Sequence, residues 1–363
     1  MRPFSTLKNV IKMNNYICEN ISYEVIKTLY RRFKTFPENT SNLRNAPFHE
    51  AFLKAFSKKI SNEFTDLKNF ISLSSWLQGL NTSLGQSFFE NVSHILSGGI
   101  KKGFTRKNNN NLLESPKQKS VVDKIITNLQ NGSSIPNLEQ ENKAIFINSI
   151  NKNFIEAIDF TADVFIEDKN EIVCIEIKSV KPNAGEIRGE KRKILEAKSA
   201  LFNKFQDKNI KYYIGFPFDP TSNSETGYEK KRFLSSIVGG SKYLDLKEII
   251  IASEFWNLLS GRKNTMNDIL SIINKIATPE FMEKFEFINN HLNINSNNYI
   301  KQLKDWYLFS EAEIILNKEI ITSRLDKRGK RIFNQPIFKT HPSKSGGNIK
   351  YNNSRYEFLR MYM

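Results

Sequence analysis

The sequence predicts an α/β fold with a central mixed sheet flanked by helices, and further helical parts at both ends of the chain. Three observations predict it. Between residues 160 and 220 the apolar pattern changes from strand-like to helical and back. Before residue 98 and after residue 254, apolar residues recur three and four positions apart, as on amphipathic helices. A hydrophobic content of 39% over 363 residues suffices for a packed interior.

The N-terminal part is expected to be helical. Helices are predicted for "YEVIKTLYRRF" and "HEAFLKAFSKKISNEF", with the loop "TFPENTSN" between them. Another helix is predicted over residues 82–97, with Thr82 or Ser83 as its cap and Gly98-Gly99 at its end.

The middle of the chain carries the strand signals. Residues 105–120 are polar and predict a mobile surface loop, and residues 142–157 predict a helix. Strands are predicted for "DVFI" and "EIVCIEIK", joined by the turn composition "EDKN". A helix over "AGEIRGEKRKILEAKSALFNKF" and a strand over "IKYYIGFPFDP" complete an order of strand, strand, helix, strand.

The charge of the C-terminal residues sets them apart from the rest of the chain. The last 40 residues contain ten Lys and Arg against two Asp and Glu, a net charge of +8. We therefore predict four regions, which are an N-terminal helical region (1–80), a core (81–260), a C-terminal helical region (261–323) and a basic aromatic tail (324–363).

The basic balance of the chain predicts a polyanionic partner. Lys and Arg number 54 against 38 Asp and Glu, a net charge of +16, so nucleic acid is expected. Cys18 and Cys174 are too few for a disulfide framework or a zinc site built of cysteine pairs, which favours the cytoplasm. No apolar run of about twenty residues occurs, so no membrane span is expected.

One strand carries charge where a structural sheet would carry apolar residues. Glu176 and Lys178 point to the same face, because side chains alternate along a strand. Asp163 lies in the preceding strand, and the hairpin can bring its carboxylate beside that of Glu176. Two close carboxylates repel each other unless a cation lies between them, and oxygen ligands suit Mg²⁺. Lys178 would hold or deprotonate an attacking water and offset developing negative charge, as phosphodiester hydrolysis requires.

The alternative interpretation is an exposed edge strand on which these charges have no chemical role. The apolar strand and the basic helix after it favour a nuclease.

The array of Asp163, twelve residues, then Glu176-Ile177-Lys178 resembles the PD-(D/E)XK nuclease superfamily, although the sequence has "TAD" where that family often has Pro-Asp. "IEIKSVKPNAGEIRGEKRKILEAKSAL" followed by "YYIGFPFDPTSN" resembles the TdeIII-type Type II restriction endonucleases, over about residues 80–260. Under this resemblance Asp163 and Glu176 match the metal-binding carboxylates and Lys178 the catalytic lysine.

The resemblance also implies the restriction-endonuclease-like core and the reaction. It implies Mg²⁺-dependent cleavage of double-stranded DNA at a short palindrome such as GGNCC by a homodimer. A cognate DNA methyltransferase would be a functional but not a physical partner. A repair or junction nuclease with the same site, and a basic nucleic-acid-binding protein without catalysis, remain alternatives.

Glu90 is a further candidate metal ligand. Members of the superfamily often supply a Glu from a helix before the core sheet, and Gln86, Glu90 and His94 form a polar stripe at helical spacing. The alternative is a solvated helix face.

Two basic segments are candidate DNA contacts, to phosphates or to guanine edges. Solvated helix faces, and aromatic residues that dock the tail onto the body, are the alternatives. Glu186 and Glu190 are a further possibility as groups near the metal. The candidate contacts are Arg188, Lys191, Arg192 and Lys193 in the helix after the site, and Lys327, Arg328, Lys330 and Arg331 in the tail.

Overall fold

The computed structural model describes residues 13–37, 67–147, 153–179, 182–341 and 348–363. The chain divides into two compact units. The first spans Phe89–Asp268, and the second combines Met13–Phe88 with Ile269–Met363. The four regions predicted from the sequence remain a prediction. Among the described residues, no helix combines the length and apolar content needed to cross a lipid bilayer.

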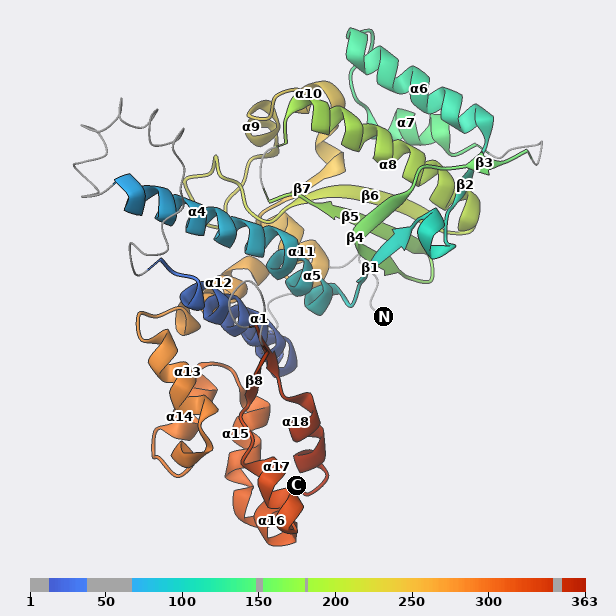
Figure 1. Cartoon of the computed structure of the whole chain (residues 1–363). Coiled ribbons are helices and arrows are strands. Elements are labelled where there is room, and N and C mark those ends of the chain that lie inside the picture. The colour runs from blue at the N-terminus through green and yellow to red at the C-terminus, as the bar shows by residue number, and fades with distance from the viewer. Residues whose placement is uncertain (1–12, 38–66, 148–152, 180–181, 342–347) are drawn as a thin grey trace. The chain divides into compact units, whose positions relative to one another are not determined.

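A five-stranded mixed sheet forms the centre of the first unit (Figure 1). Its order is β1-β4-β5-β6-β7, with the β1/β4 and β4/β5 pairs antiparallel and the β5/β6 and β6/β7 pairs parallel. The predicted α/β core is therefore confirmed. The strands are β1 (Ile100–Phe104), β4 (Phe160–Glu167), β5 (Glu171–Ile177), β6 (Asn209–Phe216) and β7 (Ile249–Ile251).

Helices cover both faces of this sheet (Figure 1). On one face α8 packs against β6, with α6 and α7 outside it, and on the other face α5 packs against β4 and α11 against β7. The short elements α9 and α10 follow β6 along the chain. The helices are α5 (Phe89–Ser97), α6 (Pro116–Asn131), α7 (Leu138–Ile145), α8 (Ala184–Lys204), α9 (Lys230–Ser235), α10 (Gly240–Tyr243), α11 (Ser253–Ser260) and α12 (Thr265–Ile276), which begins in this unit.

The order β4, β5, α8, β6 confirms the predicted strand, strand, helix, strand. The turn between β4 and β5 is closed by a 2.9 Å bond from Asp168 N–H to Glu171 C=O. Parallel strands need a long crossover, and α8 supplies it between β5 and β6. Its N-terminus carries a capping box in which Asn183 and Glu186 exchange side-chain and backbone hydrogen bonds.

Three local predictions were wrong. Part of the predicted loop 105–120 lies in α6, because Ser115 and Gln118 form a capping box that starts a helix at Pro116. The helix predicted over 142–157 ends at Ile145, and β3 (Ile155–Glu156) pairs with β2 (Leu113–Glu114). Neither Thr82 nor Ser83 caps a helix, since α4 (Leu67–Ser83) runs through a π-helical turn, η3 (Leu84–Phe88), into α5.

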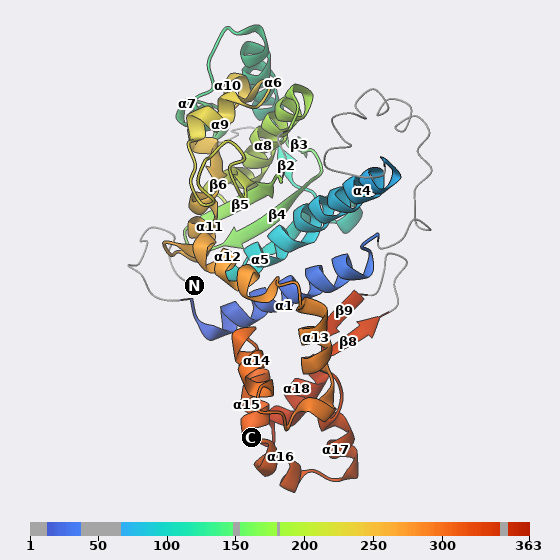
Figure 2. The same cartoon turned by 90° about the vertical axis from the view of Figure 1, so that its left-hand side faces the viewer.

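The second unit is mainly helical, as Figure 2 shows. The predicted helix of residues 23–33 lies within α1, whereas that of residues 49–64 falls outside the described residues. The described residues of the tail are packed, since Tyr351 of β9 stacks on Tyr23 of α1 at 4.3 Å and Arg355 forms a buried ion pair with Glu311 at 2.6 Å. Besides α4 and η3, the unit contains α1 (Asn15–Lys34), α13 (Phe281–Asn289), η6 (His291–Asn293), α14 (Tyr299–Asp305), α15 (Phe309–Leu316), α16 (Lys318–Arg324), α17 (Lys327–Phe333), β8 (Phe338–His341), β9 (Asn348–Tyr351) and α18 (Asn353–Arg360).

Candidate active site

Asp163 and Glu176 lie side by side on neighbouring strands. Val164 pairs with Ile175 in the β4/β5 ladder, so the next position puts Asp163 beside Glu176, on the same face. One carboxylate oxygen of Asp163, Oδ2, accepts the Ile177 N–H at 2.9 Å and so continues the ladder. The Glu176 side chain is only 12% exposed and follows four apolar residues of β5, Ile172–Ile175. Ionised groups are rarely buried to this extent unless they are paired or bind a cation.

Two lysines and two glutamates alternate around Glu176 to form a four-membered ring of ion pairs. Lys178 Nζ lies 3.2 Å from Glu176 Oε1 and 2.8 Å from Glu190 Oε1. Lys193 Nζ lies 3.0 Å from Glu176 Oε2 and 2.9 Å from Glu190 Oε2. Glu190 and Lys193 lie one turn apart in the first half of α8. Glu176 lies in β5, and Lys178 directly follows that strand. We call these four residues the site ring.

A third lysine joins the carboxylates on the other side of Asp163. Lys101 of β1 lies 2.8 Å from Glu90 Oε2 and 3.5 Å from Asp163 Oδ1. His94 Nε2 is 2.7 Å from the backbone carbonyl oxygen of Asp163, a contact that ties α5 to β4. Glu90 and His94 therefore face the sheet, and the interpretation of this stripe as a merely solvated helix face does not hold for these two residues.

Burial and charge act against each other within the site ring. Burial raises the pKa of Glu176, and the nearby Lys193 ammonium opposes this only in part. Burial would lower the pKa of Lys178, but its hydrogen bond to Glu190 and the charge of Glu176 outweigh burial and raise it. Burial would also raise the pKa of Glu190, yet hydrogen bonds from Lys178 and Lys193 lower it. Lys178 is thus held as an ammonium ion at neutral pH.

The oxygen donors at the site suit a hard divalent cation. Within the part of the chain that the structure describes, no three His, Cys, Asp or Glu side chains are grouped as a complete metal cage. Mg²⁺ is commonly bound through one or two carboxylates and several waters, and Asp163 beside Glu176 supplies that number. Glu90 is linked to Asp163 through Lys101, whose ammonium contacts both carboxylates.

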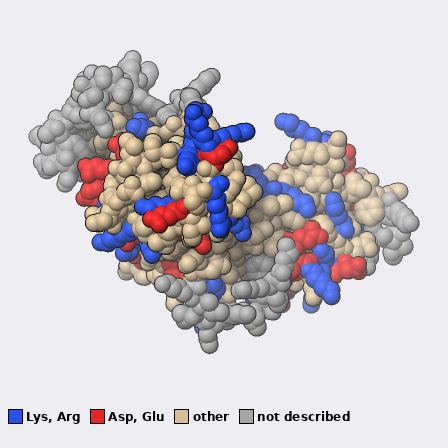
Figure 3. Space-filling model, turned by 90° about the horizontal axis from the view of Figure 1, so that it is seen from below, with Lys and Arg blue, Asp and Glu red and all other residues tan. Residues whose placement is uncertain are grey.

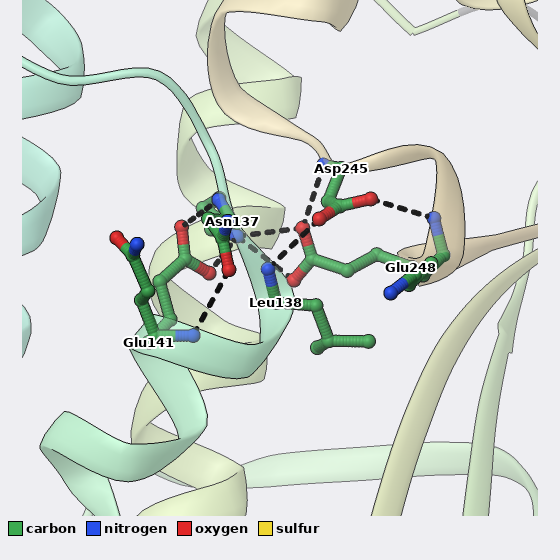
Figure 4. A network of polar contacts seen from close by, with 8 residues as sticks. Asn137, Leu138, Glu141, Asp245 and Glu248 are labelled. Atoms are coloured by element: carbon green, nitrogen blue, oxygen red, sulfur yellow. Dashed lines mark hydrogen bonds and ion pairs between the residues drawn. The ribbon is translucent and has the colours of Figure 1, made fainter.

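Lys191, a predicted DNA contact, lies on the opposite side of α8 from the site ring and is fully buried. Its ammonium donates to Glu141 Oε2 at 2.5 Å and to Glu248 Oε2 at 2.6 Å. Figure 4 shows Glu141 and Glu248 in a wider network with Asn137, Leu138 and Asp245. Burial removes Lys191 from the candidate DNA contacts, because a residue with no exposed surface cannot reach a phosphate.

The other predicted DNA contacts have mixed surroundings. Arg188 is exposed, Arg192 pairs with Asp123 at 2.5 Å and with Glu196 at 3.3 Å, and Lys193 belongs to the site ring. All four basic residues of α17 are exposed, and none forms an ion pair with another described residue: Lys327, Arg328, Lys330 and Arg331. Figure 3 shows basic and acidic side chains interspersed over the face that it draws, so net charge alone does not mark a DNA-binding face.

Two members of the site were missed or misplaced by the sequence analysis. Lys101 lies in the short segment "IKKGF", which has no motif to single it out. Lys193 was assigned to DNA contact, although its spacing of three residues from Glu190 is the signal for a helical ion pair.

Known proteins resemble this chain along nearly its whole length. A family model described as Type II restriction endonuclease, HinfI, matches residues 13–277. The Type II restriction enzyme MjaII of Methanocaldococcus jannaschii is 42% identical over 370 residues, which cover 96% of this chain and 98% of that enzyme. The predicted Type II restriction endonuclease is thereby confirmed. The matching model is that of HinfI, whereas the sequence resemblance pointed to TdeIII-type enzymes. The chain belongs to the HinfI family of Type II restriction endonucleases and is a site-specific deoxyribonuclease.

Proposed function

We propose that Asp163, Glu176 and Lys178 form the catalytic centre for hydrolysis of phosphodiester bonds in double-stranded DNA. The observation that carries this is the pairing of two carboxylates on adjacent strands, with the Lys178 ammonium 3.2 Å from Glu176. The alternative of an exposed edge strand does not fit, because β5 is a central strand that lies between β4 and β6.

Each residue then has a definite role. Asp163 and Glu176 would hold a divalent cation, Mg²⁺, and Glu90 is a weaker candidate ligand. The cation supplies an activated water and stabilises charge on a phosphate oxygen when it is bound. Lys178 stays positively charged, so it orients the scissile phosphate and offsets the negative charge that develops in the transition state. Binding of the cation and DNA would release Lys178 from the carboxylates that hold it in this structure.

The proposed substrate and assembly rest on membership of the Type II restriction endonucleases. The site recognised is a short palindrome, for which GGNCC is the candidate. A two-fold DNA site favours a homodimer, since the protein symmetry then matches that of the DNA. Arg188 and the four basic residues of α17 are exposed candidates for phosphate contacts. The enzyme would act in the cytoplasm beside a cognate DNA methyltransferase, its functional partner.

Digestion of a plasmid of known sequence tests the proposal. Discrete fragments in Mg²⁺, and none in EDTA, are expected. Asp163→Ala should lose cleavage but retain DNA binding, because it removes a metal-binding carboxylate and no phosphate contact. Asp207→Asn, an exposed carboxylate between α8 and β6, is the matched control and should cut like the wild type. Undiminished cutting by Asp163→Ala would contradict the assignment, and cleavage only of branched DNA would indicate a junction nuclease instead.

A further inference from the structure

The connection between β6 and α9 is unusually long and carries no helix or strand. It spans residues 217–229, "PFDPTSNSETGYE". Irregular loops of this length inside a compact fold are uncommon, and many of them are binding loops or active-site lids. We call it the β6 loop.

Its backbone is held in one conformation by several anchors. Asp219 is buried, and its carboxylate accepts the Thr221 N–H at 2.8 Å and the Glu229 N–H at 3.2 Å, which joins the two ends of the loop. Trp256 of α11 donates to Pro217 C=O at 2.8 Å. A Cβ on Gly227 would lie 2.8 Å from Ser222 Oγ, so only glycine fits there without a local shift. The loop is therefore preorganised, as a specific binding element needs to be.

The β6 loop leaves the sheet next to the candidate catalytic lysine. Lys178 N–H donates to Gly215 C=O at 2.9 Å, so the end of β5 and the end of β6 lie at the same edge. Phe218 of the loop packs against Phe89, the neighbour of Glu90, with ring centroids 6.4 Å apart. Ligands of open α/β sheets bind outside the carboxyl ends of the strands, and that is where this loop lies.

The tip of the loop presents polar side chains. Asn223, Ser224 and Glu225 are exposed, and their side chains form no hydrogen bond or ion pair with another described residue. The loop that carries Glu225 leaves the sheet at the same end as the proposed catalytic residues, where DNA phosphates would repel an exposed carboxylate. It finds a favourable partner on DNA in an amino group of a base edge, and Glu characteristically accepts a hydrogen bond from cytosine N4.

We propose that the β6 loop is the specificity-determining element of this enzyme, with Glu225 accepting a hydrogen bond from a cytosine amino group in the major groove and Asn223 contacting a neighbouring base. The proposal rests on the catalytic assignment above only for the position of the DNA.

Sequence discrimination by binding tests it independently of catalysis. All proteins are the full chain carrying Asp163→Ala, either alone or together with Asn223→Ala or Glu225→Gln. Their binding is measured to the duplex that the wild type cuts and to duplexes in which each base pair is replaced in turn. The expected result is a loss of roughly 10- to 100-fold in preference for the cognate duplex, concentrated at one base pair for each variant, with unchanged melting temperature. Gly227→Ala, which disturbs the loop from within, should lower discrimination at both positions.

Matched controls lie at the opposite end of the same strands. Asn170→Ala, in the turn between β4 and β5, and Asp207→Asn are exposed changes of the same chemical kind and should keep full preference. If Asn223→Ala and Glu225→Gln discriminate as sharply as these controls, the proposal is overturned. Cutting by Asp163→Ala would overturn the catalytic assignment instead, so the two failures are distinguishable.

Discussion

Helix α8 places two lysines in opposite surroundings, although only one residue separates them. Lys191 is completely buried between Glu141 and Glu248, whereas the side chain of Lys193 is 23% exposed and faces Glu176 and Glu190 in the site ring. Both lysines touch two carboxylates. Lys191 and Glu248 have no exposed surface, so the charges of this cluster hold α7, α8 and the segment before β7 together. The side chains of the site ring are between 12% and 27% exposed, so a ligand can reach their charges and they can exchange partners.

The first prediction concerns the buried cluster and carries the largest expected effect. Lys191→Met leaves Glu141 and Glu248 buried without their cation. Breaking a buried ion pair in this way costs about 3–5 kcal/mol. Chemical denaturation should show this loss, and Lys211→Met, which breaks a partly exposed pair with Glu171, is the control with a much smaller cost. Below its melting temperature the Lys191 variant should still cut DNA, and unchanged stability would refute the assigned structural role.

The second prediction concerns the site ring. Lys178→Met removes a charge that acts mainly in the transition state, so single-turnover cleavage should fall by about 100- to 1,000-fold at saturating Mg²⁺. Melting temperature and DNA affinity should stay near wild type, because the ring is open and Glu190 keeps Lys193. Lys211→Met at the other end of the sheet should cut normally. If the rate of Lys178→Met stays within about threefold of wild type, the loss is far smaller than that expected for a catalytic contact. That result would show that the ring is structural.

The third prediction uses pH to separate a buried lysine that has acceptors from one that has none. Lys198 lies on the same side of α8 as Lys191 and is buried, and its Nζ has no hydrogen-bond partner among the described residues. Burial lowers its pKa to about 8, against the opposing charge of Glu248. Between pH 8 and the ordinary lysine pKa, the unfolded chain binds more protons at this residue than the folded chain does. The free energy of unfolding should therefore rise with pH across that window.

Lys198→Met should remove that rise and should stabilise the protein at pH 7, where the buried ammonium is unfavourable, by an amount on the order of 3 kcal/mol. Parallel denaturation curves at pH 7, 8, 9 and 10 for wild type and variant measure it. Identical pH dependence of the two proteins would contradict the prediction.

The smallest effect is expected where lysines and arginines have no carboxylate partner. Replacing the four basic residues of α17 by glutamine should weaken DNA binding and flatten the slope of log affinity against log salt by up to about 0.9 for each lost phosphate contact. These exposed changes leave the fold intact, whereas deleting the tail would break the buried Glu311–Arg355 pair. Lys301→Gln with Lys304→Gln, exposed on α14 in the same unit, is the control, and equal slopes for both variants would exclude α17 from the contacts.

The sequence alone determined the features that depend on neighbouring residues. Strand alternation placed Glu176 and Lys178 on one face, the turn composition closed the hairpin that brings Asp163 beside Glu176, and the longer motif block indicated the class of enzyme. The first two depend on contacts within about fifteen residues, where side-chain alternation along a strand and the length of the turn limit the geometry. The third depends on resemblance to a known family and not on local geometry. The cap at Ser115 is also local, and it was missed because the polar composition around it is equally typical of a loop.

Only the tertiary structure decided which charged side chains contact one another. Lys191 and Lys193 look alike on the printed sequence, but the partners of Lys191 lie 50 and 57 residues away on α7 and before β7. Lys101 reaches Asp163 only because β1 pairs with β4 across more than fifty intervening residues. The physical reason is that the surroundings of a charged side chain depend on how sheet and helices pack, and that packing sums many long-range apolar contacts that no local pattern contains.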